Sequence, residues 1–322
     1  NLEELVGALD ECRVDYFHID CLDDETVFKD IRQIKQISRT PIDLHIITSH
    51  PEKFFQLIAD SGVEMVTFQH ENLTRKIKLP TATNTKWGLA ITSETPIDVF
   101  ADYETEIDFA LFMATKPGYS GGNFNKENFK KIREFQRRYR NIRVHVDGGV
   151  NDEISFVLRN MGVYAAVSGS FLVNAQSIGA ALGHLKSDNI ESHLLVRDFM
   201  MSNGELPLLK ESKLGLLDIL QSIEKHHMGF TILTDEHGKM TGISSNADVR
   251  RGLIANCADL NKTPIESIIN RSPIAIHEHK TINELLEFVK SLKFPILYLP
   301  VVDSQMRVTG AIKFNNLIKG ES

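Results

Sequence analysis

Short apolar runs alternate with amphipathic stretches along the first 185 residues of the chain. Seven such runs occur, and their sequences are VDYFHID, IDLHII, EMVTFQ, KWGLAI, FALFMAT, IRVHVDGG and YAAVSGS. They are too short for buried helices and rich in Val, Ile and Phe, so we expect strands. Most of the stretches between them, such as PEKFFQLIADSG, have the apolar spacing of helices. This alternation predicts a parallel α/β sheet, either doubly wound or closed into a barrel.

A (β/α)8 barrel needs one strand more than these runs provide, and its natural place is before Asn1. Because the chain opens inside an amphipathic helix pattern, we expect that the first strand is missing from this sequence. Polar side chains stand at the carboxyl ends of the expected strands, where a barrel builds its active site. They are His18, Asp20, His45, Gln69, Asp147 and Ser170.

The second half of the chain has a different rhythm. After the polar segment KSDNIES, the stretch VRDFMMSNGELPLL is followed by an amphipathic helix, a strand-turn-strand and a short helix, and PIESIINRSPIAIH opens a similar series. A repeat of about 60 residues predicts two copies of one small α/β module. We therefore expect a barrel over residues 1–185, a linker over 186–192, and a tandem module over 193–322, with copies at about 193–255 and 262–320.

Composition excludes several classes of protein. Lysine and arginine number 36 against 43 aspartates and glutamates, so the formal net charge of −7 argues against a nucleic-acid-binding protein. No run approaches the roughly 18 apolar residues of a membrane span. The cysteines at 12, 21 and 257 lie far apart without a CxxC spacing. This argues against a disulfide framework or a thiolate zinc site and favours a cytoplasmic location.

Two histidines and two carboxylates among these strand ends can converge on one divalent metal. They are His18, Asp20, His45 and Asp147. Such a donor set suits Zn, Fe, Mn or Co. A single histidine near a strand end is more often a hydrogen-bonded core residue than a ligand. For the set of four, the residues alone leave both interpretations open.

Glycine-rich loops follow the last three expected strands. They are KPGYSGGNF at 116–124, DGGV at 147–150 and SGS at 168–170. Loops of this kind expose backbone N–H groups that can bind a phosphate, and barrels commonly bind phosphate after their last two strands. Each loop alone could be an ordinary turn, whereas three in consecutive order favour a phosphate site.

Taken together, these motifs resemble those of the ribulose-phosphate 3-epimerase family. The matching stretches are FHIDCLDD, IDLHII, VTFQHE, GLAITSETP, MATKPGYSGGNF, VHVDGGV and AVSGSFL, in the order of that family, over most of residues 1–175. The resemblance implies an isomerase built on a metal-dependent TIM barrel, which inverts C3 of a ketopentose 5-phosphate substrate.

The resemblance also implies roles for individual residues. His18, Asp20, His45 and Asp147 would bind the metal, and Asp20 and Asp147 would also be the two catalytic acid/base groups. The phosphate would bind to backbone amides of Gly121, Gly122, Gly148, Gly149, Gly169 and Ser170. The chemistry agrees, because epimerisation removes a proton beside a carbonyl on one face and returns one on the other. That requires two opposed carboxylates and an electrophile.

Several positions depart from the family pattern. Gln69 stands where the family has a histidine, Leu22 and Ile47 stand where it has methionines, and the loop after Asp20 is shorter. The four predicted metal ligands are present, whereas the residues expected to line the substrate site differ. Two alternatives therefore stay open: an epimerase of another sugar phosphate, or a catalytically inactive barrel that senses a sugar phosphate or a nucleotide. The stretch DCLDD has no lysine, which argues against the orotidine-phosphate decarboxylase relatives and their D-x-K-x-x-D run.

The C-terminal repeat resembles a tandem pair of cystathionine-β-synthase (CBS) modules, and most closely the regulatory half of arabinose-5-phosphate isomerases. This implies an adenosine-type or other nucleotide effector that regulates the epimerase, and we expect a homo-oligomer. The first copy reads GISSNAD, which makes Ser245 and Asp248 the candidate ribose contacts, whereas the second has Asn316 in place of the acid. In the alternative interpretation Asp248 only caps the following helix and the module is structural.

Overall fold

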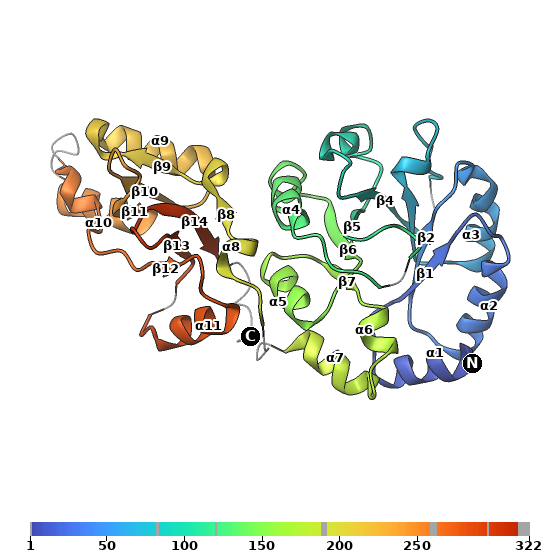
Figure 1. Cartoon of the computed structure of the whole chain (residues 1–322). Coiled ribbons are helices and arrows are strands. Elements are labelled where there is room, and N and C mark those ends of the chain that lie inside the picture. Colours follow the sequence, from blue (N-terminus) through green and yellow to red (C-terminus); the bar gives the residue numbers. More distant parts are fainter. Residues whose placement is uncertain are drawn as a thin grey trace. The chain divides into compact units, whose positions relative to one another are not determined.

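The computed structural model describes residues 2–81, 84–119, 121–187, 192–257, 263–294 and 296–314 (Figure 1). Contacts divide the chain into two compact units, Asn1–Ile190 and Glu191–Ser322. Residues 188–191 of the predicted linker lie outside the described residues, as do 258–262, which include the predicted start of the second copy, and 315–322, which include its predicted end. The exact limits of linker and copies therefore stay predictions.

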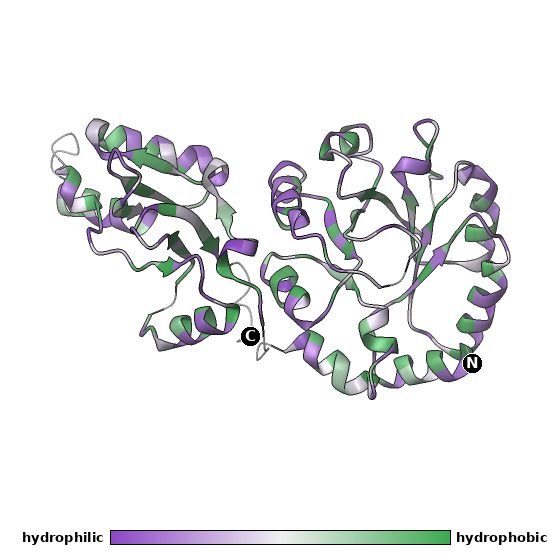
Figure 2. Cartoon of the chain, viewed as in Figure 1, coloured by the Kyte–Doolittle hydropathy of each residue, from purple (hydrophilic) through white to green (hydrophobic). Residues whose placement is uncertain are grey.

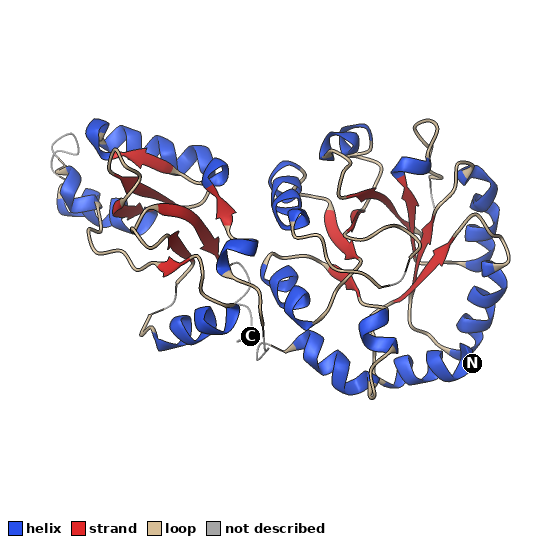
Figure 3. Ribbon diagram, viewed as in Figure 1, coloured by secondary structure: helices blue, strands red, loops and turns tan. Residues whose placement is uncertain are grey.

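The first unit is built on seven parallel strands that pair in chain order. They are β1 (Phe17–Cys21), β2 (Ile42–Ile46), β3 (Met65–Gln69), β4 (Lys86–Thr92), β5 (Phe109–Met113), β6 (Arg143–Asp147) and β7 (Ala165–Val167). Figure 3 shows them as a curved wall with helices outside it. The strands β1 and β7 form the two edges of the sheet, and no further strand joins them among the described residues. The predicted TIM-like barrel is confirmed as a nearly closed, seven-stranded one.

Amphipathic helices surround this sheet. They are α1 (Leu2–Glu11), α2 (Val27–Ile37), α3 (Phe55–Ser61), α4 (Glu127–Arg138), α5 (Asp152–Asn160), α6 (Ser170–Val173) and α7 (Ile178–Lys186), with 3-10 turns η1 (Pro51–Phe54), η2 (His70–Asn72) and η3 (Ile97–Asp102). Helix α4 buries Phe129, Ile132 and Phe135 at helical spacing. In Figure 2 these helices alternate between hydrophobic and hydrophilic positions. The apolar side of the helix layer thus covers the outside of the sheet and leaves the strand ends to form the site.

Strand register brings the expected site residues next to one another. Asp20 is the Cα partner of His45 across β1 and β2, and His18 is the partner of Asp43. On the other side of the barrel, Asp147 ends β6. Since residues two apart on a strand face the same side, the pair on β1 and the pair on β2 share one face of the sheet.

The second unit contains two sheets, with strand orders β11-β10-β9 and β12-β13-β14-β8. Its strands are β8 (Met201–Ser202), β9 (Leu208–Lys210), β10 (Phe230–Thr234), β11 (Met240–Ser245), β12 (Ile276–His277), β13 (Tyr298–Val302) and β14 (Val308–Lys313). Its helices are α8 (Val196–Phe199), α9 (Leu216–His226), α10 (Asn246–Ala255) and α11 (Ile282–Ser291), with 3-10 turns η4 (Asn203–Glu205), η5 (Glu211–Lys213) and η7 (Ile265–Ile268).

The two hairpins of this unit match in detail. Both β10–β11 and β13–β14 are antiparallel with one register shift. Asp235 and Asp303 begin the two turns, and each accepts hydrogen bonds from backbone N–H groups two and four residues later. A bridge between Lys239 and Arg307 joins the hairpins. This is the geometry expected of an internal repeat. Among the described residues of either unit, we find no helix that is long and apolar enough to span a membrane.

Candidate active and metal site

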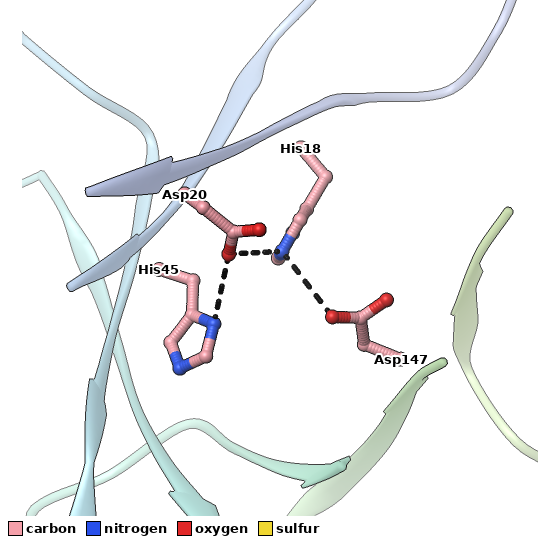
Figure 4. A group of neighbouring side chains, drawn as sticks. All are labelled: His18, Asp20, His45 and Asp147. Carbon is pink, nitrogen blue, oxygen red and sulfur yellow. Dashed lines mark hydrogen bonds and ion pairs between the residues drawn. The ribbon is translucent and has the colours of Figure 1, made fainter. Parts of the chain in front are cut away.

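The four predicted ligands meet at the carboxyl end of the barrel strands (Figure 4). One candidate donor atom from each of His18, Asp20, His45 and Asp147 lies within 4.8 Å of all the others. The sequence explains this convergence in part, because β1 supplies two of them at positions two apart on the same face. Parallel strands whose carboxyl ends share one rim bring the other two from β2 and β6.

The distances within the cluster fit a shared cation. His45 Nδ1 lies 3.1 Å from Asp20 Oδ1. His18 Nε2 lies 3.6 Å from Asp20 Oδ1 and 3.8 Å from Asp147 Oδ2. That buried nitrogen has no hydrogen-bond partner among the residues that the structure describes. An unpartnered ring nitrogen facing two carboxylates, beside a second imidazole, is a donor set that fits a divalent metal.

The surroundings of Asp20 and Asp147 shift the pKa values of these two carboxyl groups in opposite directions. Burial alone would raise the pKa of Asp20, but the neighbouring imidazoles of His18 and His45 outweigh it and hold that pKa well below its usual range. For Asp147 burial dominates, so its pKa is raised although His18 opposes the shift. For His18, burial by itself lowers the pKa, but the neighbouring carboxylates, Asp43 foremost and then Asp20 and Asp147, outweigh it and raise the pKa well above the usual value. The site thus holds two carboxylates with different proton affinities.

Each candidate histidine ligand has a second partner behind it. His18 Nδ1 lies 2.9 Å from Asp43 Oδ2, and His45 Nε2 lies 2.8 Å from Gln69 Oε1. Asp43 and Gln69 are 4% and 1% exposed. From the sequence alone, Asp43 does not stand out, and Gln69 is visible only as a polar strand-end residue that departs from the family pattern. The spacing of Asp43 two residues before His45 is the signal that could have identified it, because it places both on one face.

The predicted phosphate residues share a cavity with the cluster. A cavity of about 820 Å³ is lined by His18, Asp20 and Asp147. Its lining also includes the predicted phosphate residues Gly121, Gly148, Gly149, Gly169 and Ser170. Gly122 directly follows Gly121 in the same loop, and Ser120 before them lies outside the described residues. The structure thus brings three of the four predicted ligands and most of the expected phosphate residues around one space.

Two of these glycines also have a packing reason to be glycine. Gly148 and Gly149 have φ values of +108° and +66°. A Cβ atom at Gly148 would lie 2.9 Å from Thr115 Cβ, and one at Gly149 would lie 2.9 Å from Phe124 Cα. The loop after β6 therefore packs closely against the loop after β5, and this packing accounts for the DGG motif independently of a phosphate.

Comparison with known proteins identifies the barrel. The ribulose-phosphate 3 epimerase family model matches residues 1–173, which is more than half of the chain. The chain belongs to the ribulose-phosphate 3-epimerase family. The ribulose-phosphate 3-epimerase of Schizosaccharomyces pombe is 25% identical over 199 residues, which cover 58% of this chain and 87% of the relative. That of Bacillus subtilis is 24% identical over 186 residues, covering 53% and 86%. The barrel is accordingly a carbohydrate epimerase, an enzyme of the isomerase class.

The second unit is a CBS module, because the CBS domain model matches residues 265–321. A solved structure that is similar to it is a CBS domain-containing protein of unknown function from Bacillus anthracis. It has 16% identity and a TM-score of 0.35, and the match covers 39% of this chain and 91% of that one. The resemblance to arabinose-5-phosphate isomerases stays a prediction.

Ser245 and Asp248 meet at the start of α10. Ser245 N donates to Asp248 Oδ2 at 2.9 Å, and Asp248 N donates to Ser245 Oγ at 3.2 Å. This reciprocal pair is a capping box, so both predicted nucleotide contacts have a helix-capping role. A nucleotide role for them stays a prediction, and Asn316 of the second copy lies outside the described residues.

Proposed function

We propose that the barrel is a metal-dependent 3-epimerase that interconverts ribulose 5-phosphate and xylulose 5-phosphate. The observation that carries this proposal is the convergence of two histidines and two aspartates within 4.8 Å, beside a cavity of about 820 Å³. Membership of the epimerase family supports the reaction type.

His18, Asp20, His45 and Asp147 would hold the metal, which we expect to be Zn, Fe, Mn or Co. Bound there, a divalent metal would supply a Lewis acid that withdraws electrons from the substrate carbonyl. His18 lies between the two aspartates, since its Nε2 is 3.6 Å from one and 3.8 Å from the other. Asp20 lies on β1 and Asp147 lies on β6, so the two carboxylates would reach a bound substrate from different strands.

The two aspartates would perform the proton transfers. One removes the proton from C3 next to the carbonyl, and the other delivers a proton to the opposite face of the resulting enediolate. Both side chains line the cavity, with 38% of Asp20 and 18% of Asp147 exposed, so both can reach a ligand. The 5-phosphate would bind to the backbone amides at Gly121, Gly122, Gly148, Gly149, Gly169 and Ser170.

The direct test follows hydrogen at C3. Metal-loaded protein is incubated with ribulose 5-phosphate in D2O, and we expect xylulose 5-phosphate carrying deuterium at C3 by NMR. Asp60→Asn, on the exposed side of α3, serves as a control that keeps full activity. If the wild-type protein binds metal but neither exchanges C3 nor forms product, the pentulose substrate is wrong. Exchange with a different ketose phosphate would favour the epimerase of another sugar phosphate, and binding without exchange would favour the sensor.

For the CBS module we propose an adenosine-type nucleotide effector that binds near Ser245 and Asp248. An aspartate suits a ribose because it can accept hydrogen bonds from two hydroxyls. Titration of AMP into the full chain is expected to release heat in the wild type and less in Asp248→Asn, which keeps a capping side chain. Equal binding in both would remove Asp248 from the site. A cytoplasmic location and a homo-oligomer stay predictions.

A further inference from the structure

The His45 ring lies between two hydrogen-bond acceptors. It is fully buried, with Nδ1 3.1 Å from Asp20 Oδ1 and Nε2 2.8 Å from Gln69 Oε1. The other end of the Gln69 carboxamide donates to Glu71 Oε2. Because an ionised carboxylate only accepts hydrogen bonds, the amide nitrogen of Gln69 must face Glu71 and its oxygen must face His45. The proton of the neutral His45 ring then belongs on Nε2, which leaves the lone pair of Nδ1 directed toward the cluster.

Glu71 is held as an acceptor by the turn after β4. Its Oε1 accepts from Thr92 N at 2.8 Å, from Thr92 Oγ1 at 3.1 Å and from Thr95 Oγ1. Burial alone would raise the pKa of Glu71, but these hydrogen bonds outweigh it and lower the pKa. The carboxylate form is therefore the one that faces Gln69 at neutral pH, and a flipped Gln69 amide would place two oxygens against each other.

The turn itself is anchored by helix α4. Lys131 Nζ donates to the carbonyl oxygens of Thr92 at 2.8 Å, Ser93 at 3.0 Å and Thr95. A continuous series of hydrogen bonds thus runs from α4 through the β4 turn and Glu71 to Gln69 and His45. Hydrogen-bonded support of this kind holds a metal-binding side chain such as His45 in a fixed orientation before the metal binds.

We propose that Gln69, oriented by Glu71, is a positioning residue that fixes His45 in the Nε2–H tautomer for metal binding through Nδ1. The inference rests on the proposed metal site. His18 is arranged in the opposite sense, because Asp43 holds its Nδ1 and leaves Nε2 to face the cluster. Partners behind metal ligands typically change metal affinity by about 10- to 100-fold.

The test compares Zn2+ affinity and the His45 tautomer in the full-length chain. Gln69→Leu introduces an apolar side chain of similar size and removes both hydrogen bonds, so we expect about 10- to 100-fold weaker Zn2+ binding in competition with a chromophoric chelator. In 15N-histidine NMR spectra, wild-type His45 should carry its proton on Nε2, and Gln69→Leu should lose this preference. Gln69→His should restore both properties, because a neutral imidazole can accept from His45 and donate to Glu71.

Gln56→Leu is the matched control, because it also removes a glutamine–carboxylate hydrogen bond, to Asp60 on the exposed side of α3. It should leave Zn2+ affinity unchanged. Should Gln69→Leu fail to fold, Glu71→Gln frees the Gln69 amide to flip and should also weaken Zn2+ binding. If His45→Ala binds Zn2+ as tightly as the wild type, the proposed metal site is wrong, and the proposed function is wrong with it. Tight wild-type binding that Gln69→Leu or Glu71→Gln leaves unaltered would overturn only the positioning role.

Discussion

Asp43 holds His18 through Nδ1 at 2.9 Å, so that Nε2 of the same ring points toward Asp20 and Asp147. The carboxylate is almost fully buried at 4% exposure and lies on β2, directly opposite His18 in the register of β1. A carboxylate behind a histidine ligand fixes both the tautomer and the direction of the ring. The orientation of the site therefore depends on a residue that is not one of the four predicted metal ligands.

Replacement of Asp43 should weaken metal binding while the barrel stays folded. Asp43→Ala frees the His18 ring, so we expect about 10- to 100-fold weaker metal affinity. Asp43→Asn keeps an oxygen acceptor and should lose less. Metal content after dialysis against a weak chelator measures both, and circular dichroism reports the fold. Equal metal retention in all three proteins would contradict the role of Asp43.

Asp20→Asn and Asp147→Asn should each lower the rate of epimerisation by at least about 10²-fold, because each removes one proton-transfer group. The two variants should differ in isotope exchange. The variant that keeps the base for C3 of ribulose 5-phosphate can still remove and return that proton on one face. It should therefore place deuterium in the starting ketose in D2O without forming the epimer.

NMR of recovered substrate distinguishes the two variants. Both must retain metal for the comparison to be valid, so metal content is measured in the same samples. Normal epimerisation by either variant would exclude that aspartate from the proton transfers.

Gly149→Ala should destabilise the barrel, whereas Gly169→Ala should not. Alanine at position 149 would have to adopt a left-handed backbone conformation, at a cost of about 1–2 kcal/mol. Its Cβ atom would also contact the backbone of Phe124. A Cβ at Gly169 would meet no atom within 4 Å among the described residues. Thermal unfolding of both variants tests the stability difference, and an unchanged melting temperature in Gly149→Ala would contradict the close approach of the two loops.

Gly169→Ala should also change the binding of the sugar-phosphate substrate. If its loop binds phosphate, the added methyl group should raise KM for the sugar phosphate with little change in melting temperature. Steady-state kinetics of the folded variant measures this effect. A KM equal to that of the wild type would remove Gly169 from the phosphate site.

Glu64 should contribute to the acid sensitivity of the barrel. Burial raises its pKa, but hydrogen bonds from Ile42 N and Lys35 Nζ, at 2.9 Å and 2.7 Å, lower the pKa below its ordinary value of 4.5. A carboxyl whose pKa is lower in the folded state adds stability above its unfolded pKa and loses it as the pH falls through the folded pKa. Between pH 6 and more acidic conditions below 4.5, the melting temperature of Glu64→Gln should therefore fall less than that of the wild type. Parallel curves for both proteins would contradict this contribution.

The pattern of the sequence was sufficient for a parallel α/β sheet and for four polar residues at its strand ends, whereas the choice of a barrel and of a metal site also needed the family resemblance. Alternating apolar and amphipathic segments specify parallel strands with helices outside, and strand alternation places His18 with Asp20 on one face. The rule that parallel strands share one carboxyl rim then predicts convergence with His45 and Asp147. Both inferences depend only on local periodicity and on strand direction.

Other features depend on register and packing, which distant segments determine. The sequence alone did not show that Asp43 lies opposite His18, or that Gln69 links His45 to Glu71, because these contacts depend on how neighbouring strands pair. Only the tertiary structure showed that Gly148 and Gly149 pack against the loop after β5, and that Asp248 shares a capping box with Ser245. A linear motif names the residues at a strand end, whereas the spatial neighbours of each side chain decide which ring nitrogen, amide or carboxylate faces the site.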